Sequence, residues 1–388
     1  MSSRPPTEAP AGPLDGVTVL DLSRVLAGPY ATQLLGDMGA DVWKVERPGA
    51  GDETRGWGPP FVAGESAYFL SVNRNKKSAA LDFGEPAHRA ALLAAARAAD
   101  IVVENFLPGD LLRFGLDAAA LRAANPDLVV CSITGYGQDG PYASLPGYDA
   151  VLQGFTGLMA ITGPADGPPC KVGVAVVDVL TGAHAAAAML GAYAGRLRGR
   201  GGAHLDVALF EVGVASLVNV TQAALATGRP ARRHGNAHPQ IVPYQTFEAE
   251  GGALVVAVGN DAQWQRLCAA LGLTDLAGDP RFAGNAGRVE HRDDVVAALA
   301  ARFRAGPRDA WLAKLGAARV PAGPVREVHE VVADPALDQR GMIHRGAGPG
   351  GADLLGAPFV AGGRRPALRL PPPALGAHTA EFLERFGR

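Results

Sequence analysis

The chain has 388 residues, of which 48% are hydrophobic, and its formal net charge is −2. This length predicts roughly two domains. The near-neutral charge argues against a nucleic-acid-binding face and against a patch for anionic membranes, because both need an excess of Lys and Arg. Cys131, Cys170 and Cys268 are too far apart for metal-ligand spacing, so we expect reduced thiols, no metal site and a cytoplasmic protein.

The beginning of the chain is polar and proline-rich. Residues 1–13 read MSSRPPTEAPAGP, which predicts a disordered tail and not a signal peptide. No later stretch is expected to reach the length of an uninterrupted membrane span.

A strand, a helix and a second strand follow this tail. Residues 17–22 (VTVLDL) are rich in β-formers, residues 30–38 have helical spacing before Gly39, and residues 41–45 (DVWKV) form another apolar run. Such a βαβ unit predicts two parallel strands joined by a right-handed crossover.

A dinucleotide-binding fold begins in the same way, and Glu46 stands where its ribose-binding acidic residue would be. However, the first turn reads SRVLAG over residues 23–28, without the glycines of the GxGxxG fingerprint. Without them the backbone cannot closely approach a pyrophosphate, so the sequence disfavours NAD binding.

Strands and helices keep alternating in the following segments. This alternation predicts an open α/β sheet with binding sites at the carboxyl ends of its strands. The strands are expected at residues 78–82, 101–104, 128–133 and 204–208, and the helices at residues 86–99, 118–125, 148–159 and 210–226.

The composition changes near Gly228, where residues 228–235 are basic and contain Gly and Pro. A hairpin over residues 244–258 and three helices predict a smaller α+β domain beyond this linker. The helices are expected near residues 261–271, 289–303 and 308–315.

The last part of the chain is rich in Gly and Pro and ends in a short helix, residues 378–386. We expect this segment to return to the first domain. The predicted division is therefore a large domain over residues 14–227, a small domain over 228–330 and a returning segment over 331–388.

One apolar stretch holds a single carboxylate: residues 173–193 read GVAVVDVLTGAHAAAAMLGAY. A helix that starts just after Asp178 would be apolar on nearly all sides and hence buried. Its N-terminal N–H groups and dipole would favour the negative charge. Asp178 is either a helix cap or a nucleophile toward an activated acyl carbon. Gly173, Gly182 and the alanines leave volume that a ligand could fill.

Residues suited to coenzyme A occur in the first half of the chain. Asn105 and Phe106 follow a predicted strand and could form a slot for adenine, although an ordinary core position is the alternative for Phe106. Cationic side chains could pair with phosphates, although a solvated basic turn is the alternative. These cations are Arg47, Arg55, Arg74, Lys76, Lys77 and Arg113.

Several long motifs occur in the same order as in one known family. Because of these motifs, the chain resembles a family III CoA-transferase of the CaiB/BaiF superfamily over nearly its whole length. The resemblance implies a Rossmann-like large domain that holds both chain ends, an interlocked homodimer, and acyl-CoA and carboxylic acid substrates without a prosthetic group. The motifs are LDGVTVLDLSRVLAGPYATQLLGDMGADVWKVERPGAGDETRGWGP, NRNKKS, VENFLPGDLLRFGL, GYDAVLQGFTGLMAITG, the Asp178 stretch and RHGNAHPQIVPYQTF.

The resemblance also implies roles for individual residues. Asp178 matches the aspartate that becomes acylated. Leu26 and Ala27 lie where backbone groups of family members hold the CoA arm. The formyl-transferring members have a glutamine at the position of Leu26. Arg47 and Arg113 match phosphate-contacting arginines. Arg74 and Lys76 are further candidate phosphate contacts, chosen on their positive charge alone. The residues that match the nucleotide-side wall are Leu81, Phe83, Asn105 and Phe106.

The implied reaction passes through an aspartyl anhydride and an aspartyl-CoA thioester, and an ordinary Asp pKa of about 3.9 would keep Asp178 ionised. The stretches GDETRGWGPPFV and GNAHPQIVPYQ resemble transferases that act between succinyl-CoA and other dicarboxylates. We expect an oxyanion loop at Gly235, Asn236, Ala237 and His238, and cations for the far carboxylate at Arg232 and Arg233.

Two other functions remain open from the sequence. The α-methylacyl-CoA racemases of the superfamily use a histidine where this chain has Tyr148, whose phenol is a poor base at a pKa of about 10. A catalytically silent acyl-CoA-binding protein is the second alternative, and the presence of Asp178 argues against it.

Overall fold

The structure is a computed structural model that describes residues 12–387, so most of the predicted tail lies outside the described residues. The chain forms two compact units. The first consists of Met1–Leu158, Val172–Arg229 and Pro335–Arg388, and the second of Met159–Lys171 and Pro230–Asp334.

One segment belongs to a different unit than the sequence predicts. Residues 159–171 were expected in the large domain, but they group with the second unit. The reason is Arg233, whose guanidinium donates hydrogen bonds to the carbonyl oxygens of Ala160, Pro164 and Gly167.

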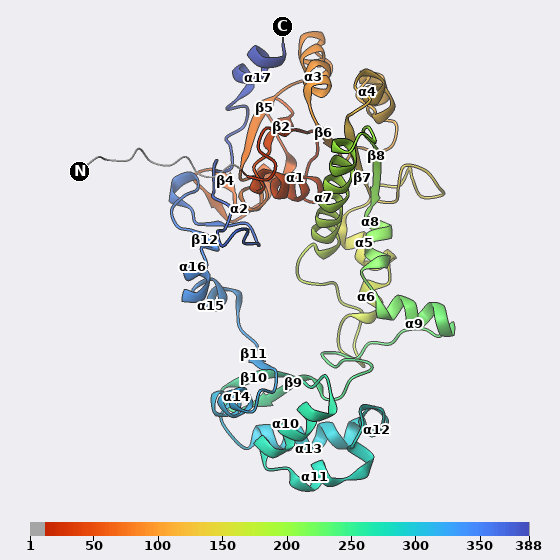
Figure 1. The fold of residues 1–388 in the computed structure, drawn as a ribbon, viewed down its shortest axis with the longest axis vertical. Coiled ribbons are helices and arrows are strands. Elements are labelled where there is room, and N and C mark those ends of the chain that lie inside the picture. Colours follow the sequence, from red (N-terminus) through yellow and green to blue (C-terminus); the bar gives the residue numbers. More distant parts are fainter. Residues whose placement is uncertain (1–11, 388) are drawn as a thin grey trace, which may run out of the picture. The chain divides into compact units, whose positions relative to one another are not determined.

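The first unit is built on a sheet of six parallel strands in the order β5-β2-β1-β6-β7-β8 (Figure 1). The predicted parallel pairing of the first two strands is confirmed, with Thr18 opposite Asp41. The strands are β1 Thr18–Asp21, β2 Asp41–Glu46, β5 Lys76–Ala80, β6 Ile101–Glu104, β7 Val129–Thr134 and β8 His204–Ala208.

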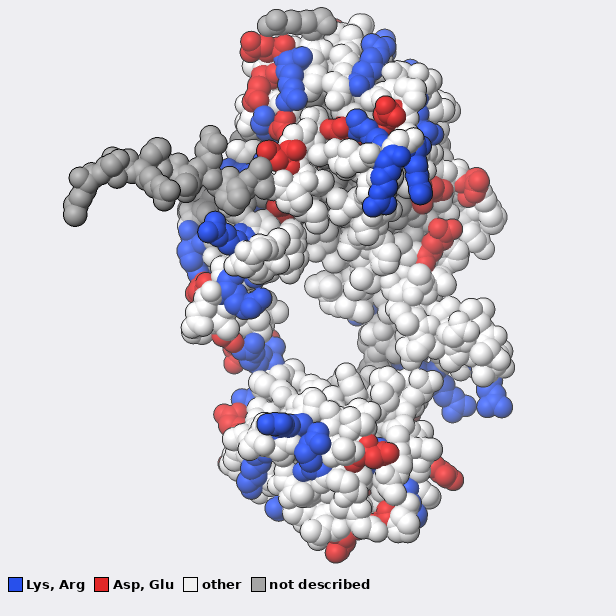
Figure 2. Space-filling view, viewed as in Figure 1, with Lys and Arg blue, Asp and Glu red and all other residues white. Residues whose placement is uncertain are grey.

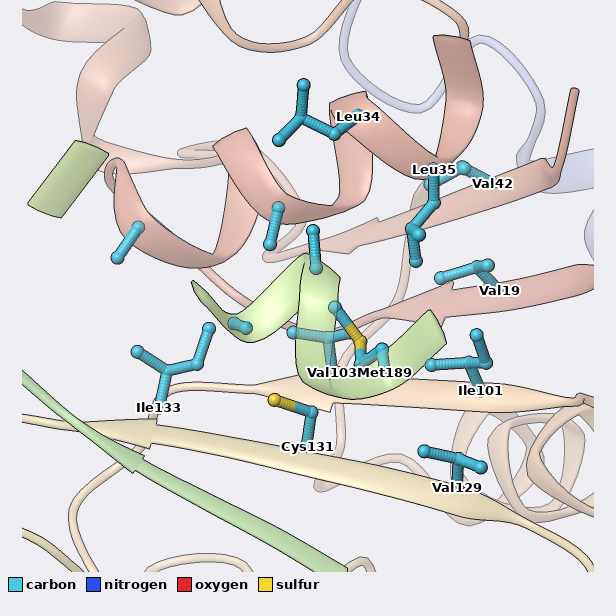
Figure 3. Close-up of a cluster of buried hydrophobic side chains, with 14 of the residues drawn as sticks. Val19, Leu34, Leu35, Val42, Ile101, Val103, Val129, Cys131, Ile133 and Met189 are labelled. Atoms are coloured by element: carbon cyan, nitrogen blue, oxygen red, sulfur yellow. The ribbon is translucent and has the colours of Figure 1, made fainter. Parts of the chain in front are cut away.

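Alternate residues of the central strands face two separate cores. Val19 and Val103 lie in one cluster with α1 (Ala27–Asp37) and α7 (Val176–Leu197), as Figure 3 shows. Leu20 and Val102 lie in the other cluster, with α3 (Pro86–Ala98) and α17 (Thr379–Phe386). Burial on both faces is the usual condition of a parallel sheet.

Helix α7 packs closely on α1 because of a glycine. A Cβ built on Gly182 would lie 2.5 Å from the carbonyl oxygen of Ala27 and 3.0 Å from the Tyr30 ring. The space at Gly182 is therefore filled by α1, which corrects the expectation of a ligand there. Helix α7 is also long and apolar enough to cross a membrane, contrary to the sequence estimate, but Val177, Ala185, Ala186 and Met189 are buried in the first core.

Two predicted helices are each broken in two. Gly157, at φ +88°, separates α5 from α6, and the chain turns by 81° between α8 and α9, where Val218 has φ +44°. The remaining short elements of the first unit and its border are β3 Phe61–Val62, β4 Glu65–Ser66, α2 Ala67–Ser71, α4 Ala118–Ala124, α5 Asp149–Phe155, α6 Leu158–Ile161, α8 Leu209–Ala215, α9 Asn219–Thr227, α16 Pro335–Gln339, β12 Ile343–His344 and β13 Leu354–Leu355.

The returning C-terminal segment covers the edge strand β5. The N–H of His378 donates to the carbonyl of Ser78, and the N–H of Ala80 donates to the Thr379 hydroxyl at 2.9 Å. Phe382 of α17 is fully buried against Trp43, with ring centroids 5.4 Å apart. An edge capped in this way is not open to pairing with another strand.

The second unit has its own core around a three-stranded antiparallel sheet in the order β11-β10-β9. The predicted hairpin is confirmed. The elements are β9 Tyr244–Ala249, β10 Gly252–Ala257, α10 Asp261–Leu271, α11 Thr274–Gly278, α12 Asn285–Glu290, α13 Arg292–Arg304, α14 Arg308–Ala317, β11 Ala322–Pro324 and α15 Val328–Val332. On the face drawn in Figure 2, basic and acidic side chains are interspersed.

Candidate active site

The strand order of the first unit reverses at β1, which has β2 on one side and β6 on the other. Ligands of open α/β sheets bind at the carboxyl ends of strands at such a point. The two loops that leave these strands are joined here. The Arg24 N–H donates to Asn105 Oδ1 at 2.9 Å, and Asn105 Nδ2 donates to the Arg24 carbonyl at 2.7 Å.

Two adjoining cavities open at this position. The Arg47 cavity, of about 330 Å³, is lined by the predicted residues Arg47, Leu81, Phe83, Phe106 and Arg113. The Asp178 cavity, of about 240 Å³, is lined by the predicted residues Leu26, Ala27, Asn105, Phe106 and Asp178. These residues are far apart in the chain, and the sequence analysis predicted that they form one site. In the structure they line two neighbouring cavities.

Asp178 lies in the first turn of α7 and is 9% exposed. It does not cap the helix, so that interpretation is wrong. The cap comes from Asp149, whose Oδ1 accepts hydrogen bonds from the N–H groups of Val177 at 2.8 Å and Asp178 at 3.3 Å. Asp149 is itself held by Gln153, whose Nε2 donates to Asp149 Oδ2 at 2.7 Å.

The surroundings of Asp178 change its acidity. Burial, and after it the nearby carboxylate of Asp149, raise the pKa of Asp178 to about 7. The expectation of an ordinary pKa is therefore corrected, because burial disfavours the charged form of this carboxylate.

Tyr68 of α2 is a neighbour that the sequence analysis missed. Burial raises its pKa to about 12, and the carboxylates of Asp178, Asp149 and Asp52 act in the same direction. The phenol therefore keeps its proton at neutral pH. Its ring is held edge-on against Trp57, with centroids 5.2 Å apart.

Two predicted phosphate contacts have a structural role instead. The guanidinium of Arg74 is buried and lies 2.5 Å from Asp37. The ammonium of Lys76 is fully buried, 3.1 Å from Asp21 and 2.8 Å from the Pro29 carbonyl. Strand β5 begins two residues earlier than predicted, so Lys76 points into the unit and not toward solvent.

The predicted substrate loop lies in the second unit. Arg232 and Asn236 are exposed, and Asn236 Nδ2 donates to the Thr246 hydroxyl at 3.0 Å. His238 Nδ1 accepts the N–H of Gln240 at 3.0 Å, and burial and Arg292 lower the pKa of His238. Arg233 is bound to three carbonyl groups of its own unit, so its predicted contact with substrate is corrected. Gly235 and Ala237 contribute backbone to the same loop.

Comparison with known proteins identifies the family of the chain. The profile described as "CoA-transferase family III" matches residues 14–379. The chain belongs to CoA-transferase family III. Like the other members it is an enzyme that acts on CoA thioesters. Among residues 12–387, no three His, Cys, Asp or Glu side chains are grouped as a metal site would require.

Several relatives of this family III CoA-transferase have specific names. The succinate–glutarate CoA-transferase of Agrobacterium fabrum is 43% identical over 379 residues, covering 96% of this chain and 95% of that protein. The succinyl-CoA:mesaconate CoA-transferase of Haloarcula hispanica is 38% identical over 388 residues, covering 97% of each chain. The crystal structure of a CaiB/BaiF family protein from Brucella suis has a TM-score of 0.85 and 43% identity, covering 97% of this chain and all of that one.

Proposed function

We propose that this CoA-transferase moves CoA from succinyl-CoA to a free dicarboxylic acid, with Asp178 as the covalent nucleophile. The observation that carries the proposal is the position of Asp178, which is nearly buried in a cavity that adjoins the arginine-lined Arg47 cavity. A nucleotide held by Arg47 and Arg113 would direct its thioester arm toward Asp178. The names of the relatives in Agrobacterium and Haloarcula support the choice of dicarboxylates.

The proposed reaction consists of four exchanges at carbonyl carbons. The Asp178 carboxylate attacks the thioester, expels CoA thiolate and forms a mixed anhydride. The thiolate attacks the aspartyl carbonyl, releases the donor acid with one oxygen of Asp178 and leaves an aspartyl-CoA thioester. The incoming carboxylate attacks the aspartyl carbonyl of this thioester, releases CoA thiolate and forms a second mixed anhydride. The thiolate then takes the new acyl group and restores the Asp178 carboxylate.

The cavity suits these intermediates. Burial of Asp178 keeps water away from the anhydride and the thioester, both of which would otherwise hydrolyse. The cavity also includes Leu26 and Ala27 at the start of α1. Backbone N–H groups of a first helical turn lack partners within the helix and can stabilise a developing oxyanion.

The test follows the oxygen atoms. With succinyl-CoA and ¹⁸O-labelled glutarate as substrates, the proposal expects ¹⁸O to enter the peptide that contains Asp178 and then to leave in succinate. Peptide and product masses measure both transfers. Label that reaches succinate without ever entering Asp178, or turnover that survives Asp178→Ala, would contradict the proposal.

The exposed cation Arg232 is our candidate for the far carboxylate of the acid. Its positive charge is the feature that suits this role, because a guanidinium forms charge-assisted hydrogen bonds with a carboxylate. Arg232→Ala is expected to raise KM for dicarboxylic acids and to leave KM for monocarboxylic acids unchanged. An equal effect on both classes would contradict the assignment.

We also propose that the enzyme works as an interlocked homodimer. Supporting this, exposed apolar side chains lie on α9 and directly before it, with Leu225 75% and Val218 69% accessible. Such exposure on a helix favours an interface. Light scattering is expected to give twice the chain mass of 39.8 kDa.

A further inference from the structure

One cation lies between the two cavities. Arg24 and Phe106 line both the Arg47 cavity and the Asp178 cavity. The guanidinium carbon of Arg24 lies 4.9 Å from the centre of the Phe106 ring. Any molecule that extends from one cavity into the other must therefore pass these two side chains.

The backbone around Arg24 is fixed. Both of its polar backbone groups are bound to the Asn105 side chain. The next residue, Val25, has φ +70°, and its N–H donates to the Asp52 carboxylate at 3.2 Å. Asp52 is in turn 2.8 Å from the buried ammonium of Lys44. A positive φ is rare for a β-branched residue and persists only where its surroundings enforce it.

The side chain of Arg24 is held much less firmly. Its Nη1 lies 2.6 Å from Glu53 Oε1, and the two side chains are 42% and 47% exposed. Such exposed pairs contribute little free energy. The Arg24 Nε–H is buried, and no acceptor for it is found within residues 12–387. A buried donor without a partner destabilises this arrangement, so a ligand that supplies a better acceptor would displace it.

We propose that Arg24 and Glu53 form a latch on the path of coenzyme A. In the free enzyme, Glu53 holds the guanidinium against Phe106. When CoA binds, the guanidinium exchanges Glu53 for an oxygen acceptor of the ligand, either a diphosphate oxygen or an amide carbonyl of the arm. The latch rests on the proposed function, because that function requires one CoA molecule to extend across both cavities.

The latch predicts effects of opposite sign for its two members. Arg24→Ala removes a charged donor and is expected to weaken CoA binding about tenfold or more. Glu53→Gln keeps the shape but removes the competing charge, and it is expected to tighten CoA binding severalfold. The double variant Arg24→Ala/Glu53→Gln is expected to bind like Arg24→Ala alone, because Glu53 acts only through Arg24.

Calorimetric titration of the full chain with free CoA measures these affinities without turnover. Arg97→Ala and Glu85→Gln are the matched controls, since both side chains are exposed on or next to α3. Thermal unfolding of each variant checks that it folds. A Glu53→Gln variant that binds CoA equally or more weakly would overturn the latch. A wild-type chain that binds no CoA would instead overturn the proposed function.

Titrations with ADP and with pantetheine identify the acceptor. If Arg24 binds the diphosphate, Arg24→Ala weakens ADP binding and leaves pantetheine binding unchanged. If it binds the arm, the effects are reversed. Each of these results supports the latch, whereas an unchanged affinity for both probes contradicts it.

Discussion

As the proposed nucleophile, Asp178 must meet two demands that oppose each other. A nucleophile must be ionised, yet the water exclusion that protects its intermediates disfavours the charge. The pKa of about 7 is the result, with burial as the larger cause and Asp149 as the smaller. The enzyme therefore carries a destabilised negative charge at the point where the proposed acylation would neutralise it.

This destabilisation predicts a gain in stability when the charge is removed. The folded-state pKa of about 7 lies above the ordinary value of 3.8, so ionised Asp178 destabilises the fold. The penalty is absent below about pH 4, grows between pH 4 and 7, and is complete above pH 7. Asp178→Asn is expected to raise the free energy of unfolding at pH 8 by up to about 4 kcal/mol, and by almost nothing at pH 4.

Urea unfolding of both proteins at the two pH values measures this difference. Asp139→Asn, a change at an exposed carboxylate, is the control and should show no such pH dependence. A wild-type protein as stable as the Asn variant at pH 8 would contradict the raised pKa.

Asp149 is expected to act through Asp178. An asparagine at position 149 keeps an oxygen for the N–H groups of Val177 and Asp178 but removes the neighbouring negative charge. Asp149→Asn should therefore lower the pKa of Asp178 and move the acidic limb of kcat/KM to lower pH. A uniform loss of activity at every pH, with the limb in place, would indicate a purely structural role.

The sequence identified some of these residues and missed others for physical reasons. Asp178 was visible because it is the single carboxylate in an apolar stretch. Asp149 was not, because only the fold brings α5 against the start of α7. Lys76 was misassigned because composition shows charge but not burial, and this ammonium faces Asp21 inside the unit.

At the scale of elements, the contact between α1 and α7 holds in place two residues that line the Asp178 cavity, Ala27 of α1 and Asp178 of α7. Gly182 allows this contact, because a Cβ there would lie 2.5 Å from the backbone oxygen of Ala27. Gly182→Ala must push α1 away, and we expect a loss of about 1–3 kcal/mol in the free energy of unfolding. Because Ala27 lines the cavity, KM for the CoA thioester is expected to rise as well.

The same helix offers a matched control. Gly191 of α7 is exposed, and a Cβ built there would meet nothing within 4 Å. Gly191→Ala is expected to stabilise the protein by about 0.5–1 kcal/mol, since alanine is the better helix former. If the two substitutions had the same sign in urea unfolding, the close approach of the helices would not be the cause.

Most elements follow from local patterns, and the exceptions are instructive. Strands β1 and β2 and helix α1 were predictable because apolar runs and helical spacing are interrupted by glycine and turn residues. The break between α8 and α9 was not, because it occurs at Val218, a residue that usually continues regular structure. Nothing in its local sequence marks a turn.

At the scale of the whole molecule, the chain leaves the first unit and later returns to it. The sequence predicted that the C-terminal segment returns to the first unit. It did not predict that residues 159–171 belong to the second unit. That transfer depends on Arg233 binding backbone carbonyls about seventy residues earlier in the chain. Contacts of this range leave no trace in local composition.

The returning helix makes a prediction about which part of the molecule it stabilises. Phe382 is fully buried and lies edge-on against Trp43 of β2, in a cluster that also contains residues of α3. Phe382→Ala leaves a cavity in this core and is expected to lower the free energy of unfolding of the first unit by about 3–5 kcal/mol. The edge strand β5, which α17 covers, should open first.

Hydrogen exchange followed by mass spectrometry locates this loss. Peptides from β2, β5 and α3 are expected to exchange faster in the Phe382→Ala variant, because their backbone hydrogen bonds open more often when the core above them is weakened. Peptides from α10 and α13 belong to the separate core around Trp264 and should exchange at the wild-type rate. Faster exchange throughout the chain would instead mean that the two units unfold as one, and that the C-terminal helix stabilises the whole molecule.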